Sequence, residues 1–334
     1  RLRETGVYSC NYYIKFRSTP VYACFLDLSK AFDLVSYDSL WQKLESETEL
    51  PSEFVSLLKY WYRKQQNYVK WSGSLSDVYR LECGLSSPRL FNLYTDRLIR
   101  ELSSAQVGCS IDGVFINNIS YADDMVLLSP SISALRKLVS ICEGYAESHG
   151  LRYNVSKSEL MVFKAGNKTY DAVPPVTLNG INIKKVSQFK YLGHWLTETL
   201  TDEMDMERER RALSVRANML ARRFARCTVS VKATLFRAYC QAFYTCSLWV
   251  KYSQRAYNAL RVQYNNAFRT LMGLPRFCSA SGMFADARVD SFTAIRRKRI
   301  ASVMRRVRCS SNSYLQLLAE RMDVDTPALI FMCL

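Results

Sequence analysis

Short apolar runs bounded by turn-forming residues dominate the first 200 residues. Tyr22–Leu28 predicts a buried strand with a single acid, Asp27, near its end. Asn118–Ser129 predicts a hairpin, because two short apolar arms flank Asp123 and Asp124. The other runs predict strands at Tyr68–Trp71, Asp77–Leu81, Leu160–Phe163 and Gln188–Leu196, and a hairpin at Val176–Ile183 with Asn179–Gly180 as its turn.

Helical periodicity marks the segments between these strands and most of the chain after residue 200. Ile132, Leu135, Val139 and Cys142 share one stripe, which predicts an amphipathic helix that Gly150 ends. The same reasoning predicts helices at Ser36–Ser46 and Phe54–Arg63, from Ser87–Pro88 onward, after a Thr201 cap, and at about residues 230–248, 252–272 and 290–307. We therefore expect a mixed α+β part followed by a nearly all-helical part, with the boundary near residue 198.

The positive charge of the chain lies almost entirely in the helical part. The net charge is +16, and residues 211–310 hold 20 basic and two acidic residues. Such a concentrated charge indicates a polyanion partner, although a well-solvated helical face is the alternative. The candidate nucleic-acid-binding residues are Arg222, Arg223, Arg296, Arg297, Lys298 and Arg299.

Cysteine and histidine usage narrows the class of protein. The chain has 11 Cys without a C-x-x-C pair and only two His, His149 and His194. This argues against a zinc module and against a secreted disulfide framework. The apolar runs are far shorter than the roughly 20 residues that span a bilayer, and the start at Arg1 has no signal-type pattern. We expect a soluble, intracellular chain, not secreted, that is part of a longer protein.

Three carboxylates stand out because each lies in or beside apolar strand sequence: Asp27, Asp123 and Asp124. A carboxylate there needs a cation, hydrogen bonds or solvent, since an unpaired buried charge is costly. Carboxylates at strand ends form a hard-oxygen site that suits Mg²⁺ and can hold two ions for phosphoryl transfer. The alternative for each of them is an ordinary capping acid in a turn.

Five blocks that contain these residues resemble the reverse transcriptases of non-LTR (LINE-type) retrotransposons. In chain order they are FLDLSKAFD (Phe25–Asp33, motif A), GLSSPRLFNLY (Gly84–Tyr94, the second half of motif B), YADD (Tyr121–Asp124, motif C), GLRYNVSKSELMVF (Gly150–Phe163, motif D) and FKYLGHWL (Phe189–Leu196, motif E). One block alone is a weak signal, but five in the right order are specific. The match runs from about Thr19 to Leu200, and more loosely to about residue 310.

The resemblance implies an α+β fold with a right-hand polymerase palm. That palm is a ferredoxin-like antiparallel sheet with helices, followed by a mostly helical thumb and C-terminal region. Residues 1–198 would form the palm with truncated fingers, because only 26 residues precede Asp27. Residues 199–334 would form the helical, basic thumb and the post-polymerase region.

The resemblance also implies an RNA-directed DNA polymerase that adds dNTPs to a primer 3′-hydroxyl. Its partners would be an RNA template and a DNA primer, with no membrane. Asp27, Asp123 and Asp124 would be the catalytic acids that bind two Mg²⁺ ions, with Mn²⁺ as the alternative. The implied nucleotide-binding residues are Phe32, Glu82 and Lys157, and the implied primer grip is Phe189, Tyr191, Leu192 and Gly193.

Motif B departs from the family, which leaves other functions open. The chain has Leu81, Glu82 and Cys83 where the family has Arg-Gln-Gly. Glu82 would place a negative charge near a triphosphate, and one like-charge pair at ~4 Å costs roughly 4 kcal/mol at an effective dielectric of about 20. The first alternative is a catalytically impaired remnant that only binds nucleic acid, and the second is a helical protein-interaction domain. The expected location is the nucleus and cytoplasm; the oligomeric state, host and template RNA stay open.

Overall fold

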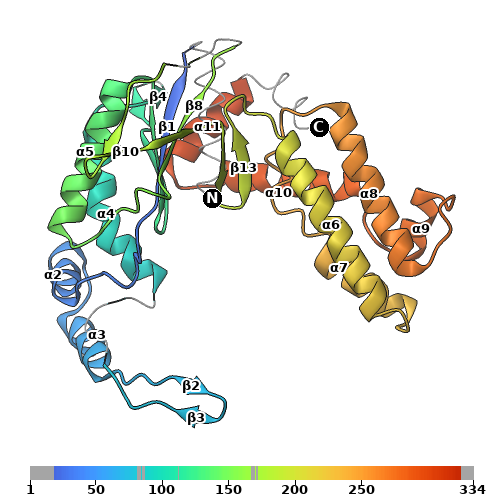
Figure 1. Cartoon of the computed structure of the whole chain (residues 1–334), viewed down its shortest axis with the longest axis horizontal. Helices are drawn as coiled ribbons and strands as arrows, with labels where there is room; N and C mark the ends of the chain where they lie inside the picture. Colours follow the sequence, from blue (N-terminus) through green and yellow to red (C-terminus); the bar gives the residue numbers. More distant parts are fainter. Residues whose placement is uncertain are drawn as a thin grey trace. The chain divides into compact units, whose positions relative to one another are not determined.

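The computed structural model describes residues 19–80, 84, 87–111, 113–166, 170 and 172–324. Two compact units divide between Val186 and Ser187, and each is described by itself (Figure 1). The division falls before the boundary expected near residue 198, because the hairpin at 188–197 packs against the first long helix of the second unit. Among the described residues, no helix combines the length and apolar character needed to cross a membrane.

A five-stranded sheet forms the centre of the first unit. The spatial order of its strands is β11 (Lys184–Val186), β8 (Glu159–Phe163), β1 (Val21–Leu26), β7 (Asp124–Ser129) and β6 (Asn118–Tyr121). Neighbours are antiparallel except β11 and β8, which are parallel. The sheet therefore departs from the expected antiparallel arrangement at one edge, where a short hairpin returns the chain to β8.

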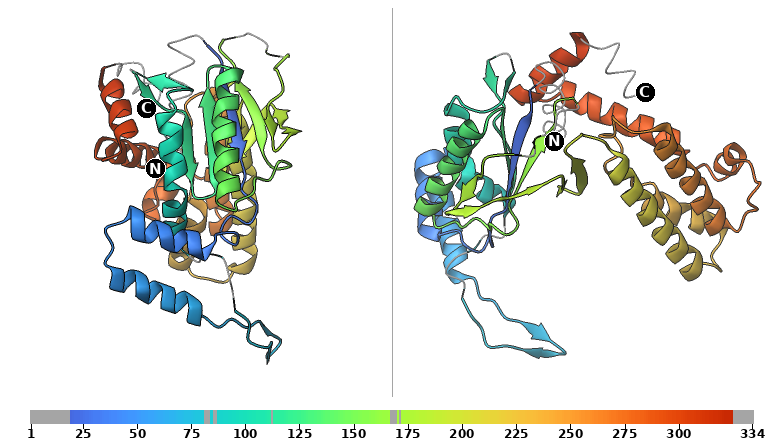
Figure 2. Two further views of the ribbon diagram at one scale, coloured as in Figure 1. Left: turned by 90° about the vertical axis from the view of Figure 1, so that its left-hand side faces the viewer. Right: turned by 45° about the horizontal axis from the view of Figure 1, so that its top comes forward.

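Two helices, α4 (Pro88–Ser104) and α5 (Ile132–Ser148), contact this sheet and each other (Figure 2). Strand alternation turns Cys24 and Leu26 of β1 toward the same core as Leu127 of β7, and all three are buried. Two more helices, α2 (Tyr37–Glu47) and α3 (Ser52–Lys64), continue from the end of β1. The helix predictions in this unit are confirmed to within a few residues, because their apolar stripes are regular.

Three small hairpins complete the first unit: β2 (Lys70–Trp71) with β3 (Ser74–Leu75), β4 (Ser110–Ile111) with β5 (Val114–Phe115), and β9 (Thr177–Leu178) with β10 (Ile181–Asn182). Asn179 and Gly180 both have positive φ, 51° and 75°, which confirms the predicted tight turn. The second strand of this hairpin begins earlier than predicted, as β3, because the two-residue turn at Ser72–Gly73 lets pairing resume at once. Within the segment predicted at 77–81, Tyr79 forms an isolated antiparallel bridge with Asn67.

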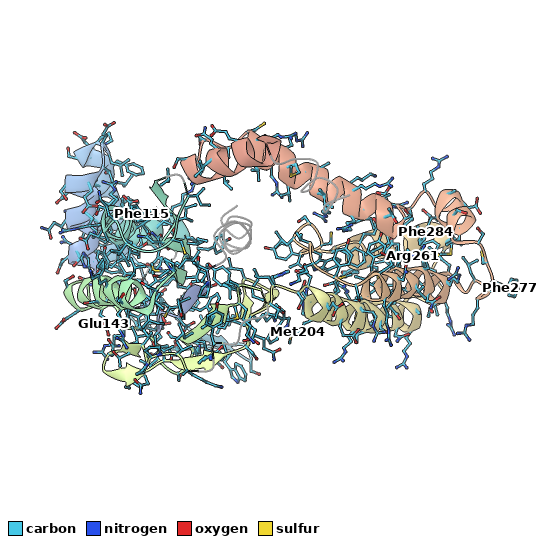
Figure 3. The ribbon with its side chains drawn as sticks, turned by 90° about the horizontal axis from the view of Figure 1, so that it is seen from above. Phe115, Glu143, Met204, Arg261, Phe277 and Phe284 are labelled. Carbon is cyan, nitrogen blue, oxygen red and sulfur yellow. The ribbon has the colours of Figure 1, made fainter. Side chains whose placement is uncertain are left out.

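The second unit begins with the hairpin β12 (Gln188–Tyr191) and β13 (His194–Thr197) and is otherwise helical. Its helices are α6 (Glu203–Arg223), α7 (Val229–Cys240), α8 (Gln254–Met272), α9 (Ala280–Asp286), α10 (Phe292–Arg308) and α11 (Ser313–Val324). Aromatic side chains fill its core, among them Phe236, which lies 4.9 Å from Phe268 between ring centroids. Figure 3 shows the buried Phe284 among these helices, whereas Phe277 points outward and is 91% exposed.

Three sequence predictions for the second unit are wrong in detail. The strand predicted at 188–196 is a hairpin, because Leu192 and Gly193 adopt positive φ and reverse the chain. Asp202, not Thr201, occupies the cap position of α6. The helix predicted at 230–248 ends at Cys240, because the segment after it folds inward to reach a buried carboxylate described below.

Candidate functional site

Two of the candidate carboxylates lie at the same end of neighbouring strands. In the β1–β7 ladder, Leu26 pairs with Met125. Asp27 comes directly after Leu26, and Asp124 directly precedes Met125, so the two acids flank the last pair of this ladder. The side chain of Asp27 is 29% exposed, and Asp124 is half-buried. The ladder therefore places side by side two segments that carry acids 97 positions apart in the sequence.

Asp123 lies in the turn between β6 and β7. Tyr121 pairs with Asp124, so only Ala122 and Asp123 remain to reverse the chain. Ala122 has φ +53°, a left-handed conformation that a non-glycine residue adopts only under constraint. The hairpin tip thus interrupts strand alternation, as the sequence predicted, and places two consecutive carboxylates at one end of the sheet.

The donor chemistry of this sheet end fits a hard cation, because carboxylate oxygens are the ligands that Mg²⁺ prefers. Asp27 and Asp124 supply such donors from adjacent strands, and Asp123 stands next in the turn. Within the part of the chain that the structure describes, no three His, Cys, Asp or Glu side chains are gathered closely enough to hold a metal ion. The backbone therefore brings the segments of the expected metal site to one end of the sheet, with Asp27 and Asp124 flanking the last pair of the ladder.

Lys157 stands beside Asp27. Its Nζ atom lies 3.9 Å from Asp27 Oδ2, and its side chain is 68% exposed. Three hydrogen bonds hold the loop that carries it: the Asp27 amide donates to Ser158 Oγ (3.2 Å), the Asn154 amide to the Asp27 carbonyl (2.8 Å), and Ser158 Oγ to the Asn154 carbonyl (2.8 Å). The backbone of Asp27 therefore fixes the position of the loop whose lysine reaches its carboxylate.

Phe32 lies on the loop that follows β1. It is half-buried, and its ring centroid is 4.8 Å from that of Phe91 on α4. Gly84 adjoins the same loop, with φ +105° and its amide donating to the Val35 carbonyl (3.2 Å). A Cβ on Gly84 would lie 3.6 Å from the Phe32 carbonyl oxygen. The loops of motifs A and B are thus in contact, whereas Glu82 lies outside the described residues.

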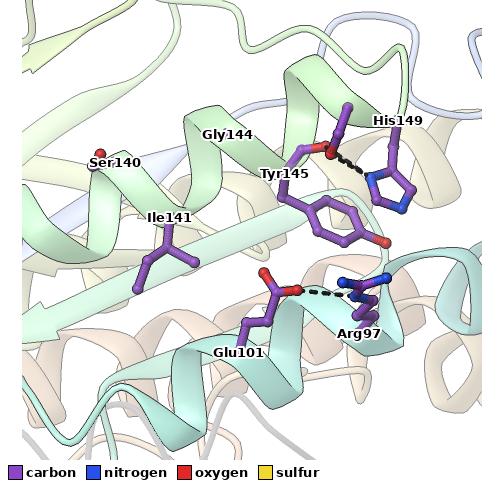
Figure 4. A pocket seen from close by; sticks show the side chains of 8 residues that line it. Arg97, Glu101, Ser140, Ile141, Gly144, Tyr145 and His149 are labelled. Carbon is purple, nitrogen blue, oxygen red and sulfur yellow. Dashed lines mark hydrogen bonds and ion pairs between the residues drawn. The ribbon is translucent and has the colours of Figure 1, made fainter.

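A separate pocket of about 380 Å³ opens between α4 and α5 (Figure 4). Its charged and polar groups pair with one another: Arg97 Nε lies 3.0 Å from Glu101 Oε1, and Ser148 Oγ lies 2.8 Å from His149 Nδ1. Burial lowers the pKa of His149, and the nearby Lys43 and Arg97 add to this effect. None of the candidate carboxylates lines this pocket, so it is distinct from the strand-end site.

In the second unit, the segment predicted to be the primer grip forms the β12–β13 hairpin. Leu192 and Gly193 make its turn, with φ of 48° and 84°. Tyr191 is buried, and Phe189 is half-buried. Directly after the turn, His194 begins β13 and is 2% exposed, so the hairpin is anchored by a buried imidazole.

His194 belongs to a buried polar network with two acids. Its Nε2 atom lies 3.5 Å from Asp202 Oδ1, and its Nδ1 atom lies 3.3 Å from Asp205 Oδ2. Asp205 is fully buried and also accepts hydrogen bonds from Thr245 Oγ1 (2.6 Å) and Trp249 Nε1 (2.8 Å). The network therefore joins β13, α6 and the segment after α7.

Charge pairing dominates the titration of this network. Burial alone would lower the pKa of His194, but Asp202 and Asp205 outweigh it and raise that pKa to about 9. Burial works against ionised Asp205 too, but His194, Arg208 and Thr245 hold the pKa of Asp205 well below its usual range. The Arg208 Nε–Asp205 Oδ1 distance is 2.8 Å. His194 is thus a cation at neutral pH.

The basic residues of the helical unit divide into exposed and buried groups. The exposed members of the predicted set are Arg222, Arg223, Arg297, Lys298 and Arg299, of which Lys298 pairs with Asp290 at 2.7 Å. Arg296 departs from the prediction, because it is only 5% exposed. Its Nη2 donates to the Trp249 carbonyl (3.2 Å), and its guanidinium lies 5.2 Å from the Tyr252 ring centroid. Arg296 is therefore a packing residue of this fold.

Comparison with known families decides the ancestry of this arrangement. The family model "Reverse transcriptase (RNA-dependent DNA polymerase)" matches residues 9–196, which is more than half of the chain. The chain belongs to the reverse transcriptase family. The matched range contains all five motif blocks, and the order of the motifs agrees with it.

The curated relatives of this reverse transcriptase chain are proteins of mobile elements. It is 29% identical to the "Retrovirus-related Pol polyprotein from type-2 retrotransposable element R2DM" of Drosophila melanogaster, over 55% of this chain and 18% of that protein. It is 23% identical to the "RNA-directed DNA polymerase from mobile element jockey" of Drosophila funebris, over 90% of this chain and 33% of that protein. The chain thus spans a third or less of these relatives and is related to the reverse transcriptases of non-LTR retrotransposons.

Among solved structures, a similarity extends to the apo telomerase of Candida tropicalis. The TM-score is 0.42 and the sequence identity is 11%, over 88% of this chain and 54% of that one. A similarity at this level carries no argument about the fold or function of this chain. The assignment of this chain to the reverse transcriptase family therefore depends on the family match.

Sequence reasoning named the candidate carboxylates but did not identify the residues that support them. Ser158 gave no signal, because a serine in a loop has many ordinary uses. Phe91 was visible only as one member of the apolar stripe of α4. Nothing in the sequence indicated that Asp205, near the start of α6, lies 3.3 Å from the buried imidazole of His194.

Proposed function

We propose that this chain is the polymerase portion of a mobile-element reverse transcriptase. It would add dNTPs to the 3′-hydroxyl of a DNA primer along an RNA template. The observation that carries the proposal is the β1–β7 register, whose last pair, Leu26 with Met125, is flanked by Asp27 and Asp124, with Lys157 Nζ 3.9 Å from Asp27. This combination of acids at a sheet end with an adjacent cation suits the handling of a triphosphate.

In the proposed reaction, the primer 3′-oxygen forms a bond to the α-phosphorus while the bond to pyrophosphate breaks. Asp27, Asp123 and Asp124 would hold the two Mg²⁺ ions, or Mn²⁺, which neutralise the charge of the phosphates when bound. Lys157 is solvent-accessible, so its Nζ can donate a proton to the departing pyrophosphate. Phe32, which packs on Phe91, would exclude the 2′-hydroxyl of a ribonucleotide by its bulk.

The second unit would hold the primer and the template. The β12–β13 hairpin would contact the primer end through Phe189, Tyr191, Leu192 and Gly193. Exposed cations such as Arg222, Arg223, Arg297 and Arg299 would contact phosphates, and such contacts weaken steeply with added salt. Copying into a genome places the protein in the nucleus as well as the cytoplasm.

A catalytically impaired remnant that only binds nucleic acid is the second candidate. The observation that favours it is motif B, in which Leu81, Glu82 and Cys83 replace the Arg-Gln-Gly of the family. A carboxylate at position 82 would oppose a triphosphate, and a side chain at position 83 would restrict the backbone. This candidate predicts salt-sensitive binding of RNA without nucleotide addition.

Primer extension separates the two candidates. The purified chain is given a DNA primer on an RNA template with dNTPs and Mg²⁺, beside an Asp123→Ala control and a Glu82→Gln, Cys83→Gly variant. Extension by the parent that the Asp123→Ala control lacks is the expected result. Extension by the double variant alone identifies an impaired copy. Salt-sensitive RNA binding without extension in either protein refutes the polymerase assignment.

A further inference from the structure

An exposed aromatic arm extends from the first unit. The arm consists of α3 and the β2–β3 hairpin, residues 52–80, and Figure 2 shows the hairpin continuing past the end of α3. On α3, Phe54, Leu57 and Trp61 recur at helical spacing and are 47%, 60% and 67% exposed. A contiguous exposed apolar surface of this kind marks an interaction site.

Trp71 of the β2–β3 hairpin faces only small side chains on the opposite strand. Trp71 is 81% exposed and pairs with Ser74 across the β2–β3 ladder. The Ser76 amide donates to the Val69 carbonyl (2.9 Å), so the ladder sets a second serine opposite Val69, on the same face as Trp71. Because its direct partner Ser74 and the diagonal Ser76 are both small and Trp71 is 81% exposed, the indole ring is accessible to a planar ligand.

Positive charge accompanies these aromatic side chains. Over residues 52–80 the arm has five basic residues and two acids, Glu53 and Asp77. Lys59 pairs with Glu45. The other four are exposed, and within the described part of the chain none of them forms an ion pair: Arg63, Lys64, Lys70 and Arg80. The surface is therefore complementary to a polyanion that also offers flat apolar groups.

We propose that the arm binds single-stranded nucleic acid, with unpaired bases stacked on Trp71 and Trp61 and phosphates held by the neighbouring cations. Aromatic rings interleaved with basic residues are the recurring means of holding single strands, since every base has a π face. In a duplex the bases are already stacked on one another, so duplex is a poorer ligand. The inference extends the proposed function, because it names a place where the unpaired template is held.

The test measures binding of the full chain to fluorescent oligonucleotides by anisotropy. The probes are single-stranded RNA of about 15 nucleotides, DNA of the same sequence, and a duplex of equal length. The variants are Trp71→Ala, Trp71→Phe and Trp61→Ala. Phe277→Ala is the matched control, because Phe277 is a more exposed aromatic residue in the other unit. Thermal melting by circular dichroism confirms that each variant is folded.

We expect Trp71→Ala to weaken single-strand binding roughly 5-fold or more, and Trp61→Ala to weaken it in the same direction. Trp71→Phe keeps an aromatic face and should stay within about twofold of the parent, as should Phe277→Ala. The salt dependence should be unchanged in Trp71→Ala, because no phosphate contact is lost. Single-stranded RNA and DNA should be affected alike, and duplex little.

Two results would overturn the inference. One is a Trp71→Ala variant that binds single strands as the parent does, or that loses duplex binding equally. The other is a parent that sediments as a dimer and becomes a monomer in Trp71→Ala with RNA binding intact, because a second copy then covers the arm. Primer extension separates this inference from the proposed function. If the parent does not extend a primer but Trp71→Ala still loses single-strand binding, the polymerase proposal is wrong and the inference about the arm is supported.

Discussion

The buried His194 gives the helical unit a stability that depends on pH. Its pKa is raised to about 9 from an ordinary value of 6.5, mainly by Asp202 and Asp205 acting against burial. Each unit of difference between folded and unfolded pKa corresponds to about 1.4 kcal/mol, so the protonated histidine contributes about 3 kcal/mol. This contribution is fully present below pH 6.5 and is lost progressively as the pH rises to 9, because only the folded state keeps the proton there.

The test compares His194→Gln with the parent by urea unfolding at pH 6, 7.5 and 9, with tryptophan fluorescence as the signal. Trp249 reports on this network, since its indole donates to Asp205 (2.8 Å). The variant should be about 3 kcal/mol less stable than the parent at pH 6 and should approach the parent at pH 9. Subtracting the variant from the parent at each pH removes the titration of the groups that do not interact with His194. If the difference in free energy of unfolding between parent and variant is constant with pH, or grows as the pH rises, the charge of His194 does not stabilise the fold.

Three further substitutions test the fold and the site separately. Gly108→Ala should destabilise the first unit by about 1–3 kcal/mol in thermal unfolding, because φ is +103° and the new Cβ would lie 2.5 Å from Asn117 Cβ; a melting temperature equal to that of the parent contradicts this. Phe32→Ala should admit ribonucleotides, so primer extension with NTPs should rise relative to dNTPs, whereas an unchanged ratio removes the steric role. Arg296→Ala should lower the free energy of unfolding by about 2–4 kcal/mol and leave the salt dependence of RNA binding unchanged. Arg299→Ala should reduce the slope of that salt dependence by about one and leave folding unaffected. If Arg299→Ala lowers stability and Arg296→Ala changes the salt slope, burial does not separate the packing arginine from the RNA-binding one.

The sequence predicted the elements that carry the site better than it predicted how they meet. The alternation around Asp123 and Asp124 marked a hairpin, and local turn chemistry is sufficient for that. The pairing of β1 with β7 spans about 100 residues, so only the tertiary fold could bring the segments that carry Asp27 and Asp124 to the same sheet end. The motif resemblance substituted for this missing information, because it groups residues by ancestry.

The sequence prediction was wrong for a buried polar residue, Arg296, which was expected to bind nucleic acid. Arg296 lies in a basic run, and nothing local distinguishes it from the exposed Arg297 next to it. Its burial depends on Tyr252 and the Trp249 carbonyl, which reach it from elsewhere in the chain.

The turn of the β12–β13 hairpin also overrides a local preference, because Leu192 adopts positive φ although leucine disfavours it.

The length of the two-residue turn at Ala122–Asp123 matters to the site more than the identity of its side chains. Replacing Ala122 changes only the strain of one left-handed residue. Inserting one residue after Tyr121 breaks the match between the Tyr121–Asp124 pair and the Leu26–Met125 pair, and a slip of one position turns every β7 side chain to the opposite face of the sheet. The core residue Leu127 would then exchange places with its neighbours, and Asp124 would no longer flank the same end of the ladder as Asp27. The strand register of this hairpin is therefore more sensitive to a one-residue insertion than to the identity of the turn residues.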